Sequence, residues 1–169
     1  MAELSGSKTE KNLQEAFAGE SQANRTYLAF AKKAEQEGFL QVAKLFRAAA
    51  EAETVHAHAH LRALGGIRST AENLKTAIGG ETHEFTLMYP RMIAEAEAER
   101  HQVPLRNFKF ANAVEKVHAG LYQKALDSLG KNIEVDFYVC QVCGHTLEGE
   151  PGGSCAICNA AKSAFKKID

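Results

Sequence analysis

The segment FRAAAEAETVHA, residues 46–57, recurs 62 positions later as FKFANAVEKVHA, residues 108–119. Both copies contain the pattern F-x-x-A-x-x-x-E-x-V-H-A, and a nearly equal offset of 61 places Gly19-Glu20 on Gly80-Glu81. Self-similarity at a fixed offset indicates a duplicated structural unit. We therefore predict two helix hairpins that carry similar chemistry at similar places.

Residues from about 8 to 129 are rich in Ala, Glu, Lys, Leu and Gln, and their apolar positions recur every three or four residues. This pattern is typical of amphipathic helices. Capping boxes that begin at Ser7 and Ser69, together with glycines near the expected ends, delimit four helices at about 8–36, 39–64, 70–99 and 104–129. Pro90 falls inside the third helix and should kink or split it, because proline removes a backbone donor and clashes with the preceding turn.

Each repeat carries a glutamate and a histidine three residues apart, which places both side chains on one helix face. A single Glu-x-x-His in a glutamate-rich helix is more often a solvated pair than a set of metal ligands. Two copies at equivalent positions, each with a Gly-Glu on the preceding helix, instead favour a dinuclear carboxylate site inside a four-helix bundle. Glu84, one turn after Glu81, adds a fifth carboxylate. The candidate ligands are Glu20, Glu53, His56, Glu81, Glu84, Glu115 and His118.

Several other side chains are weaker candidates near this site. Tyr27 and Tyr122 each follow a candidate ligand by seven residues and could donate hydrogen bonds to metal-bound carboxylates, although core packing explains them equally well. His60 is one turn beyond His56 and could also support a ligand, whereas His58 should point elsewhere. The remaining histidines are interpreted as surface residues: His83, His101 and His145.

All four cysteines form two Cys-x-x-Cys pairs, and they lie in a segment that lacks helical periodicity. Two such pairs define a tetrahedral site for zinc or a single iron, and the spacing alone favours zinc. Gly144 and Asn159 follow the two pairs and tolerate the left-handed backbone that directs amides toward sulfur. We predict a helical domain at 1–134 and a small metal domain at 135–169 that depends on its metal for folding. Its ligands are Cys140, Cys143, Cys155 and Cys158.

The overall composition excludes some classes of function. With 20 basic and 21 acidic residues, the formal charge of −1 gives no field that would hold nucleic acid or an anionic membrane. The sequence has no apolar run of membrane-spanning length and no secretory signal, which favours the cytoplasm. Clustered cysteines in a reducing compartment indicate a metal site rather than disulfides.

Taken together, the order of these motifs resembles the rubrerythrins over nearly the whole chain. The resemblance rests on Gly19–Ala23, Glu53-x-x-His56, Gly80-Glu81-x-x-Glu84 with Met88-Tyr89-Pro90, Glu115-x-x-His118 and the paired cysteines. It implies an all-α, ferritin-like four-helix bundle with a di-iron site, followed by a rubredoxin-like domain with one iron. It further implies a homodimeric hydrogen peroxide peroxidase of the NADH peroxidase type, supplied with electrons by an external NAD(P)H-dependent reductase.

The resemblance also implies roles for the ligands. Glu53 and Glu115 would bridge the irons, Glu20 and Glu84 would serve one iron, and Glu81 and His118 the other. One iron would exchange Glu84 for His56 on reduction, and the cysteine site of one chain could lie near the di-iron site of its partner. The chain departs from the family pattern at Ala156, where proline is common after the first cysteine of the second pair.

Two alternatives remain open at this stage. The same bundle would suit a ferritin-like ferroxidase or iron-handling protein, which would hold a large iron core in a closed shell. A non-enzymatic metal-binding protein with a zinc-ribbon tail would instead contain zinc at the cysteines. Metal content per chain separates these alternatives from the peroxidase.

Overall fold

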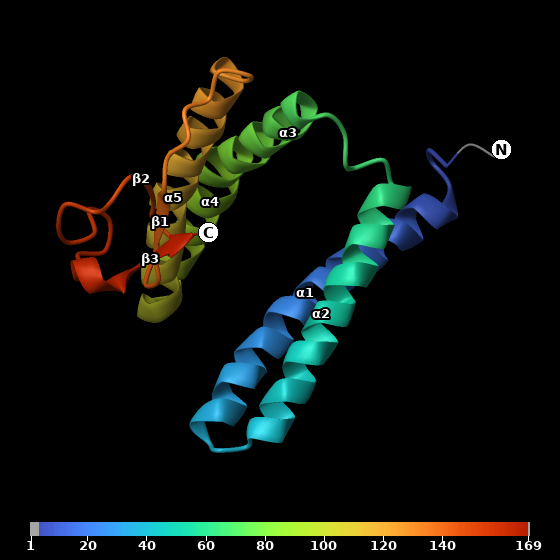
Figure 1. Ribbon diagram of the computed structural model, residues 1–169, viewed down its shortest axis with the longest axis horizontal. Helices are drawn as coiled ribbons and strands as arrows, with labels where there is room; N and C mark the ends of the chain where they lie inside the picture. Colours follow the sequence, from blue (N-terminus) through green and yellow to red (C-terminus); the bar gives the residue numbers. More distant parts are fainter. Residues whose placement is uncertain (1–3, 169) are drawn as a thin grey trace. The chain divides into compact units, whose positions relative to one another are not determined.

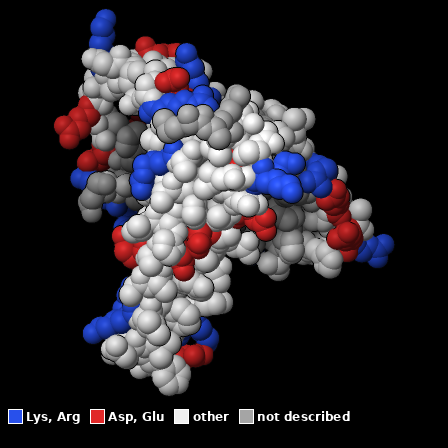
Figure 2. Space-filling model, turned by 90° about the vertical axis from the view of Figure 1, so that its right-hand side faces the viewer, with Lys and Arg blue, Asp and Glu red and all other residues white. Residues whose placement is uncertain are grey.

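The computed structural model of the chain describes residues 4–168 (Figure 1). The chain divides into two compact units, the first ending at Arg68 and the second beginning at Ser69. No helix among the described residues is long and apolar enough to cross a membrane. Acidic and basic side chains are interspersed on the face shown in Figure 2, in agreement with the nearly balanced charge.

The first unit is a hairpin of two long helices, α1 (Lys8–Gln36) and α2 (Leu40–Ala63). The Ser7 hydroxyl caps α1 by accepting a hydrogen bond of 3.1 Å from the Glu10 backbone N–H. Gly38 adopts a φ of 84° in the three-residue turn, a conformation that glycine adopts without strain. Small side chains line the contact between the helices and let them approach closely, since Ala31, Ala43 and Ala50 are each no more than 2% exposed.

The helices of the second unit are α3 (Thr70–His83), the π-helix η1 (Glu84–Met88), α4 (Tyr89–Ala98) and α5 (Gln102–Asp127). The third predicted helix is therefore split just before Pro90, as its sequence indicated. The Tyr89 backbone N–H reaches back five residues to the Glu84 carbonyl, which widens the turn ahead of the proline. This wide turn keeps Glu84 half-buried at the end of α3.

A small antiparallel sheet completes the second unit. Its strands are β1 (Phe137–Cys140), β2 (Thr146–Glu148) and β3 (Phe165–Ile168), in the order β2-β1-β3. Cys140 pairs with Phe165, and Phe137 pairs with both Glu148 and Ile168. Strands of three or four residues bury little apolar surface, so this part of the fold depends on something besides a hydrophobic core.

The sheet packs against α5 within the same unit. The Lys124 ammonium pairs with the Glu148 carboxylate, and a Cβ added at Gly144 would lie 3.7 Å from the Val114 side chain. This contact holds the four cysteines beside the helix that carries Glu115 and His118. The predicted domain boundary at 134/135 stays a prediction, and it falls in the segment without helix or strand between α5 and β1.

Candidate metal centre

Three candidate ligands meet on the α1–α2 hairpin, and we call Glu20, Glu53 and His56 the first half-site. Glu53 and His56 lie one turn apart on α2, and His56 Nδ1 is 2.9 Å from Glu53 Oε2. The same nitrogen is 3.9 Å from Glu20 Oε1 on α1. One ligand atom from each residue lies within 4.8 Å of the other two, a grouping that can hold a metal ion.

The second unit repeats this arrangement, and we call Glu81, Glu115 and His118 the second half-site. His118 Nδ1 is 2.8 Å from Glu115 Oε2 and 3.9 Å from Glu81 Oε1. The ligand atoms again lie within 4.8 Å of one another. The near-identical distances show that the sequence duplication is also a duplication of local geometry.

The charges around the second half-site favour a bound cation. Burial raises the pKa of Glu81, the carboxylates of Glu115 and Glu84 raise it further, and only His118 opposes them. Burial and the same acids also raise the pKa of the Tyr89 hydroxyl. Since like charges held together disfavour ionisation, a metal ion would relieve the excess negative charge. The donor set therefore fits a cation that prefers carboxylate and imidazole ligands.

The second nitrogen of His118 has a partner in the small sheet. His118 Nε2 lies 2.9 Å from the hydroxyl of Thr146 on β2, and that hydroxyl donates to the Gly144 carbonyl at 3.1 Å. Because the Thr146 hydroxyl donates to Gly144, its oxygen is available to accept from an Nε2–H of His118, and that tautomer would leave Nδ1 unprotonated for a metal. Thr146 was not among the candidates, because nothing in its sequence neighbourhood shows that β2 packs on α5.

The four cysteines converge in the small sheet as predicted. Cys140 Sγ is 3.7 Å from Cys158 Sγ, Cys143 Sγ is 3.6 Å from Cys155 Sγ, and all four sulfurs lie within 4.8 Å of one another. Metal–sulfur bonds of about 2.3 Å in a tetrahedron require sulfurs roughly 3.8 Å apart, and a disulfide requires about 2.0 Å. The sulfurs are thus spaced for one tetrahedral metal ion. Gly144 and Asn159 have φ values of 84° and 60°, which confirms the predicted left-handed positions.

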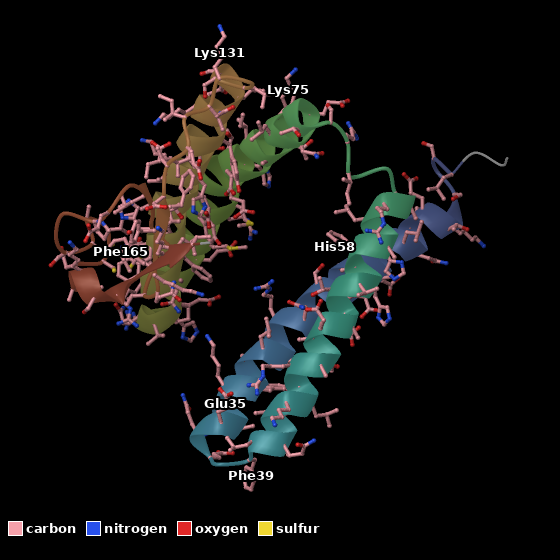
Figure 3. The ribbon with its side chains drawn as sticks, viewed as in Figure 1. Glu35, Phe39, His58, Lys75, Lys131 and Phe165 are labelled. Atoms are coloured by element: carbon pink, nitrogen blue, oxygen red, sulfur yellow. The ribbon has the colours of Figure 1, made fainter. Side chains whose placement is uncertain are left out.

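His145 corrects the interpretation of that residue as a surface histidine. Its side chain is buried, 7% exposed, with Nδ1 3.5 Å from Cys155 Sγ and its ring 6.3 Å from the ring of Phe165 (labelled in Figure 3). Burial acts to raise the pKa of Cys155, but the backbone N–H groups of Cys158 and Ile157 and the imidazole of His145 outweigh it. They lower that pKa to about 6, which favours the thiolate that a metal requires.

No hydrogen bond to a candidate ligand is present among the described residues for the three side chains that the sequence suggested as supports, Tyr27, Tyr122 and His60. The Tyr27 ring lies 6.2 Å from Phe46, and Tyr122 is 37% exposed. His60 is half-buried, and His58 is exposed on α2 (Figure 3). Hydrogen bonds from Tyr27, Tyr122 or His60 to the ligands stay predictions. No signal in the sequence selected Tyr89 as a candidate. Tyr89 begins α4 directly after the π-helix and lies near Glu81, Glu84 and Glu115.

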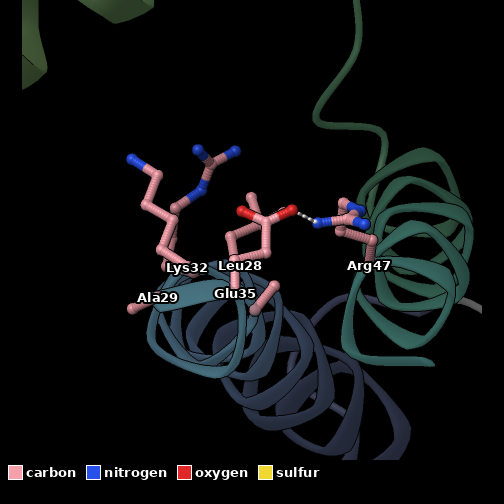
Figure 4. A pocket seen from close by; sticks show the side chains of 7 residues that line it. Leu28, Ala29, Lys32, Glu35 and Arg47 are labelled. Atoms are coloured by element: carbon pink, nitrogen blue, oxygen red, sulfur yellow. Dashed lines mark hydrogen bonds and ion pairs between the residues drawn. The ribbon is translucent and has the colours of Figure 1, made fainter. Parts of the chain in front are cut away.

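A hollow on the α1–α2 hairpin contains none of the candidate ligands. The Glu35 carboxylate and the Arg47 guanidinium form an ion pair across it (Figure 4). Its lining is of mixed charge and comprises Arg25, Leu28, Ala29, Ala31, Lys32, Glu35 and Arg47. The candidate metal chemistry therefore lies elsewhere, at the two half-sites and the cysteines.

Two family models match this chain in the order of its two kinds of site. The rubrerythrin model matches residues 11–126, and the model of the rubrerythrin rubredoxin-like domain matches residues 138–166. The chain belongs to the rubrerythrin family. It is 33% identical to rubrerythrin-2 of Clostridium acetobutylicum, with 91% of this chain and 93% of that protein covered. It is 32% identical to nigerythrin of Nitratidesulfovibrio vulgaris, with 93% and 85% covered.

Solved structures agree with this family. A solved structure of nigerythrin in a mixed-valence state is 31% identical to this chain, with a TM-score of 0.58. The match covers 99% of this chain and 90% of the nigerythrin chain. Another solved state of nigerythrin is described as fully reduced and all ferrous. The chain accordingly has a ferritin-like four-helix domain and a rubredoxin-like sheet domain. It has the residues of a di-iron carboxylate site and of a four-cysteine iron or zinc site.

Replacing Thr146 with valine should weaken iron binding at the second half-site. Valine keeps the shape and the β-propensity of threonine but removes the hydroxyl that contacts His118 Nε2. Loss of such a supporting hydrogen bond typically lowers metal affinity about 10–100-fold. Iron retention against increasing chelator, measured on Thr146→Val and on the hydroxyl-retaining control Thr146→Ser, checks this. Equal retention by Thr146→Val and the unmodified protein would contradict it.

Proposed function

We propose that this chain is a peroxidase that reduces hydrogen peroxide to water at a di-iron site, with electrons relayed through the four-cysteine iron. The observation that carries the proposal is the contact between the two kinds of metal site: the histidine of the second half-site bonds to Thr146, a residue of the sheet that holds the cysteines. An electron-transfer site next to a dinuclear site suits a redox enzyme better than iron storage.

We assign the roles of the di-iron ligands as the family implies them. Glu53 and Glu115 would be shared by the two irons, and Glu84 and His56 would alternate as ligands of one iron between the oxidised and reduced site. His56 is suited to such an exchange, because its side chain is 55% exposed and its nearest partner, Glu53 at 2.9 Å, lies one turn away on the same helix. The full ligand set is Glu20, Glu53, His56, Glu81, Glu84, Glu115 and His118.

Reduction of peroxide to two waters requires two electrons and two protons. When bound, the two ferrous ions would supply one electron each to the O–O bond, so that a radical need not escape. Tyr89 would act as a hydrogen-bond donor rather than as a proton source, since burial and the nearby Glu115, Glu84 and Glu81 raise its pKa and keep the hydroxyl neutral. A neutral hydroxyl among carboxylates is positioned to donate a hydrogen bond to an oxygen atom of the substrate.

The route for the electrons runs through hydrogen bonds within the second unit. The Gly144 N–H donates to the Cys140 carbonyl at 2.9 Å, the Thr146 hydroxyl donates to the Gly144 carbonyl, and the same hydroxyl contacts His118. We propose that each cysteine site reduces the di-iron site to which its own chain contributes His118. The resemblance to the family implied in addition that the cysteine site of one chain could lie near the di-iron site of its partner.

The proposal also includes the partners of the reaction. The family implies an external NAD(P)H-dependent reductase, and the sequence contains no flavin or dinucleotide motif of its own. We place the protein in the cytoplasm, where thiolates remain reduced enough to hold iron, and expect a homodimer as its working form.

Rapid mixing of the iron-loaded, chemically reduced protein with hydrogen peroxide tests the proposed function. We expect about one peroxide to be consumed per di-iron site in the first turnover, because two electrons are stored there. Protein that holds full iron and consumes no peroxide would refute the activity. A large iron core inside a closed shell would instead identify the ferritin-like alternative, and zinc at the cysteines of protein made with ample iron would favour a non-enzymatic role.

A further inference from the structure

The connections between the helices of this chain are all short. They comprise residues 37–39, 64–69 and 99–101, so the longest has six residues. A ferritin-like bundle contains one long crossover that carries the chain back along the bundle between its two hairpins. Residues 64–69 are the connection that would have to make this crossover, since they join α2 to α3.

The required span can be calculated from the positions of the ligands. A crossover makes α2 and α3 run in the same direction, and a shared metal site requires Glu53 and Glu81 to lie level. Glu53 lies ten residues before the end of α2 at Ala63, and Glu81 eleven residues after the start of α3 at Thr70. With a rise of about 1.5 Å per residue, the two helix ends are then roughly 31 Å apart along the bundle.

The connection is too short for this span. Seven Cα–Cα steps lead from Ala63 to Thr70, and a fully extended chain covers at most about 3.3–3.6 Å per step, roughly 25 Å in all. Moreover, its first half is a turn, in which the Gly66 N–H bonds to the Leu61 carbonyl at 2.9 Å and Gly65 has a φ of 68°. Its last residue, Ser69, is fixed as the N-cap of α3. The reach that remains is well below the fully extended limit.

We infer that two copies of this chain exchange their α1–α2 hairpins, so that each di-iron site combines the first half-site of one copy with the second half-site of the other. In this arrangement the connection does not have to cross a bundle, because α3 enters the neighbouring bundle. Reciprocal exchange is a common route to a closed dimer with two equivalent sites. The inference concerns how the irons are held and does not depend on the peroxidase activity. An up-down-up-down bundle within one chain is the competing arrangement.

Complementation between two damaged chains tests the exchange. Glu53→Ala damages the first half-site and Glu115→Ala the second, and the two chains carry different tags so that the mixed dimer can be purified after co-expression. In an exchanged mixed dimer, one site combines both damaged halves and the other combines two intact halves. We therefore expect about half of the normal bundle iron in the mixed dimer, and very little in either variant alone.

A matched pair provides the control. Glu20→Ala with Glu53→Ala damages the first half-site in both chains, so each exchanged site contains one damaged half and no iron should be recovered. Bundle iron in the Glu53→Ala with Glu115→Ala dimer that does not exceed this control would overturn the exchange. Because the readout is iron per chain, a lack of peroxidase activity would not affect the result.

A second measurement leaves every ligand in place and so avoids variants that fail to fold. Light scattering of the unmodified, iron-loaded protein over a range of dilutions should show no species smaller than a dimer. Insertion of about 20 Gly/Ser residues between Gly66 and Ile67 adds an r.m.s. reach of roughly 25 Å. We expect a monomeric species that carries bundle iron to appear in the lengthened chain and to be absent from the unmodified protein. A monomer of the unmodified chain with a fully loaded bundle would overturn the inference.

Discussion

Cys158→Ala should lower reductase-coupled peroxide turnover at least about 100-fold while a single turnover of chemically reduced protein persists. Cys158 Sγ is one corner of the sulfur tetrahedron, 3.7 Å from Cys140 Sγ. Four-ligand sites of this kind supply about 10–16 kcal/mol of binding free energy that is also folding free energy. The small sheet has little apolar core to replace that contribution, so the variant should lose both the metal and the ordered electron route.

The measurement combines NADH oxidation by a suitable reductase with peroxide consumption in single-turnover mixing. Val142→Ala is the control in the same sheet domain, because Val142 lies within the other cysteine pair, Cys140-x-x-Cys143, but is 61% exposed and carries no ligand atom. Wild-type coupled turnover by a Cys158→Ala protein without metal in the tail would show that electrons reach the bundle by another route.

Glu115→Ala should remove most of the bundle iron and reduce peroxide consumption by more than about 100-fold. Glu115 is proposed to be shared by the two irons, and its carboxylate lies 2.8 Å from Nδ1 of His118, the other proposed ligand on α5. Supporting residues alone are worth about 10–100-fold in affinity, so loss of a bridging ligand should exceed that range. The helix itself should survive, because alanine has the highest helix propensity and Glu115 is not part of the fully buried core.

Iron per chain and the rate of peroxide consumption, each compared with Glu95→Ala, check this expectation. Glu95 lies on α4 in an exposed ion pair with Arg91, so its loss removes one negative charge from the second unit without touching a half-site. Two bundle irons retained by Glu115→Ala would exclude Glu115 as a bridge and would require another carboxylate in its place.

The sequence predicted the half-sites because their information is local and repeated. Glu53 with His56, and Glu115 with His118, depend only on helical periodicity, and the duplication removed the ambiguity of a single motif. The split before Pro90 followed from the missing backbone donor, since the rule concerns one residue and its preceding turn. Features of this kind do not depend on how distant segments pack.

The missed features depend on contacts between segments far apart in the sequence. The strands β1, β2 and β3 are too short for an alternating pattern to stand out. His145 is buried because the chain wraps around the sulfurs, which made its interpretation as a surface residue wrong. Thr146 is 28 residues from His118 in the sequence and contacts it only because β2 packs on α5. No propensity or spacing rule carries that information.

The π-helix Glu84–Met88 determines how α4 is rotated about the helix axis relative to α3. Each residue of an α-helix advances the chain by about 100° around the axis, and the wide turn absorbs one residue more than a regular turn would. Deleting any one residue from it would leave a continuous helix but rotate α4 by about that angle. The Tyr89 ring, whose centroid is now 6.3 Å from that of Phe108, would lose this contact. Its hydroxyl would also point away from the nearby glutamates. The length of this turn is therefore as constrained as the identity of the ligands beside it.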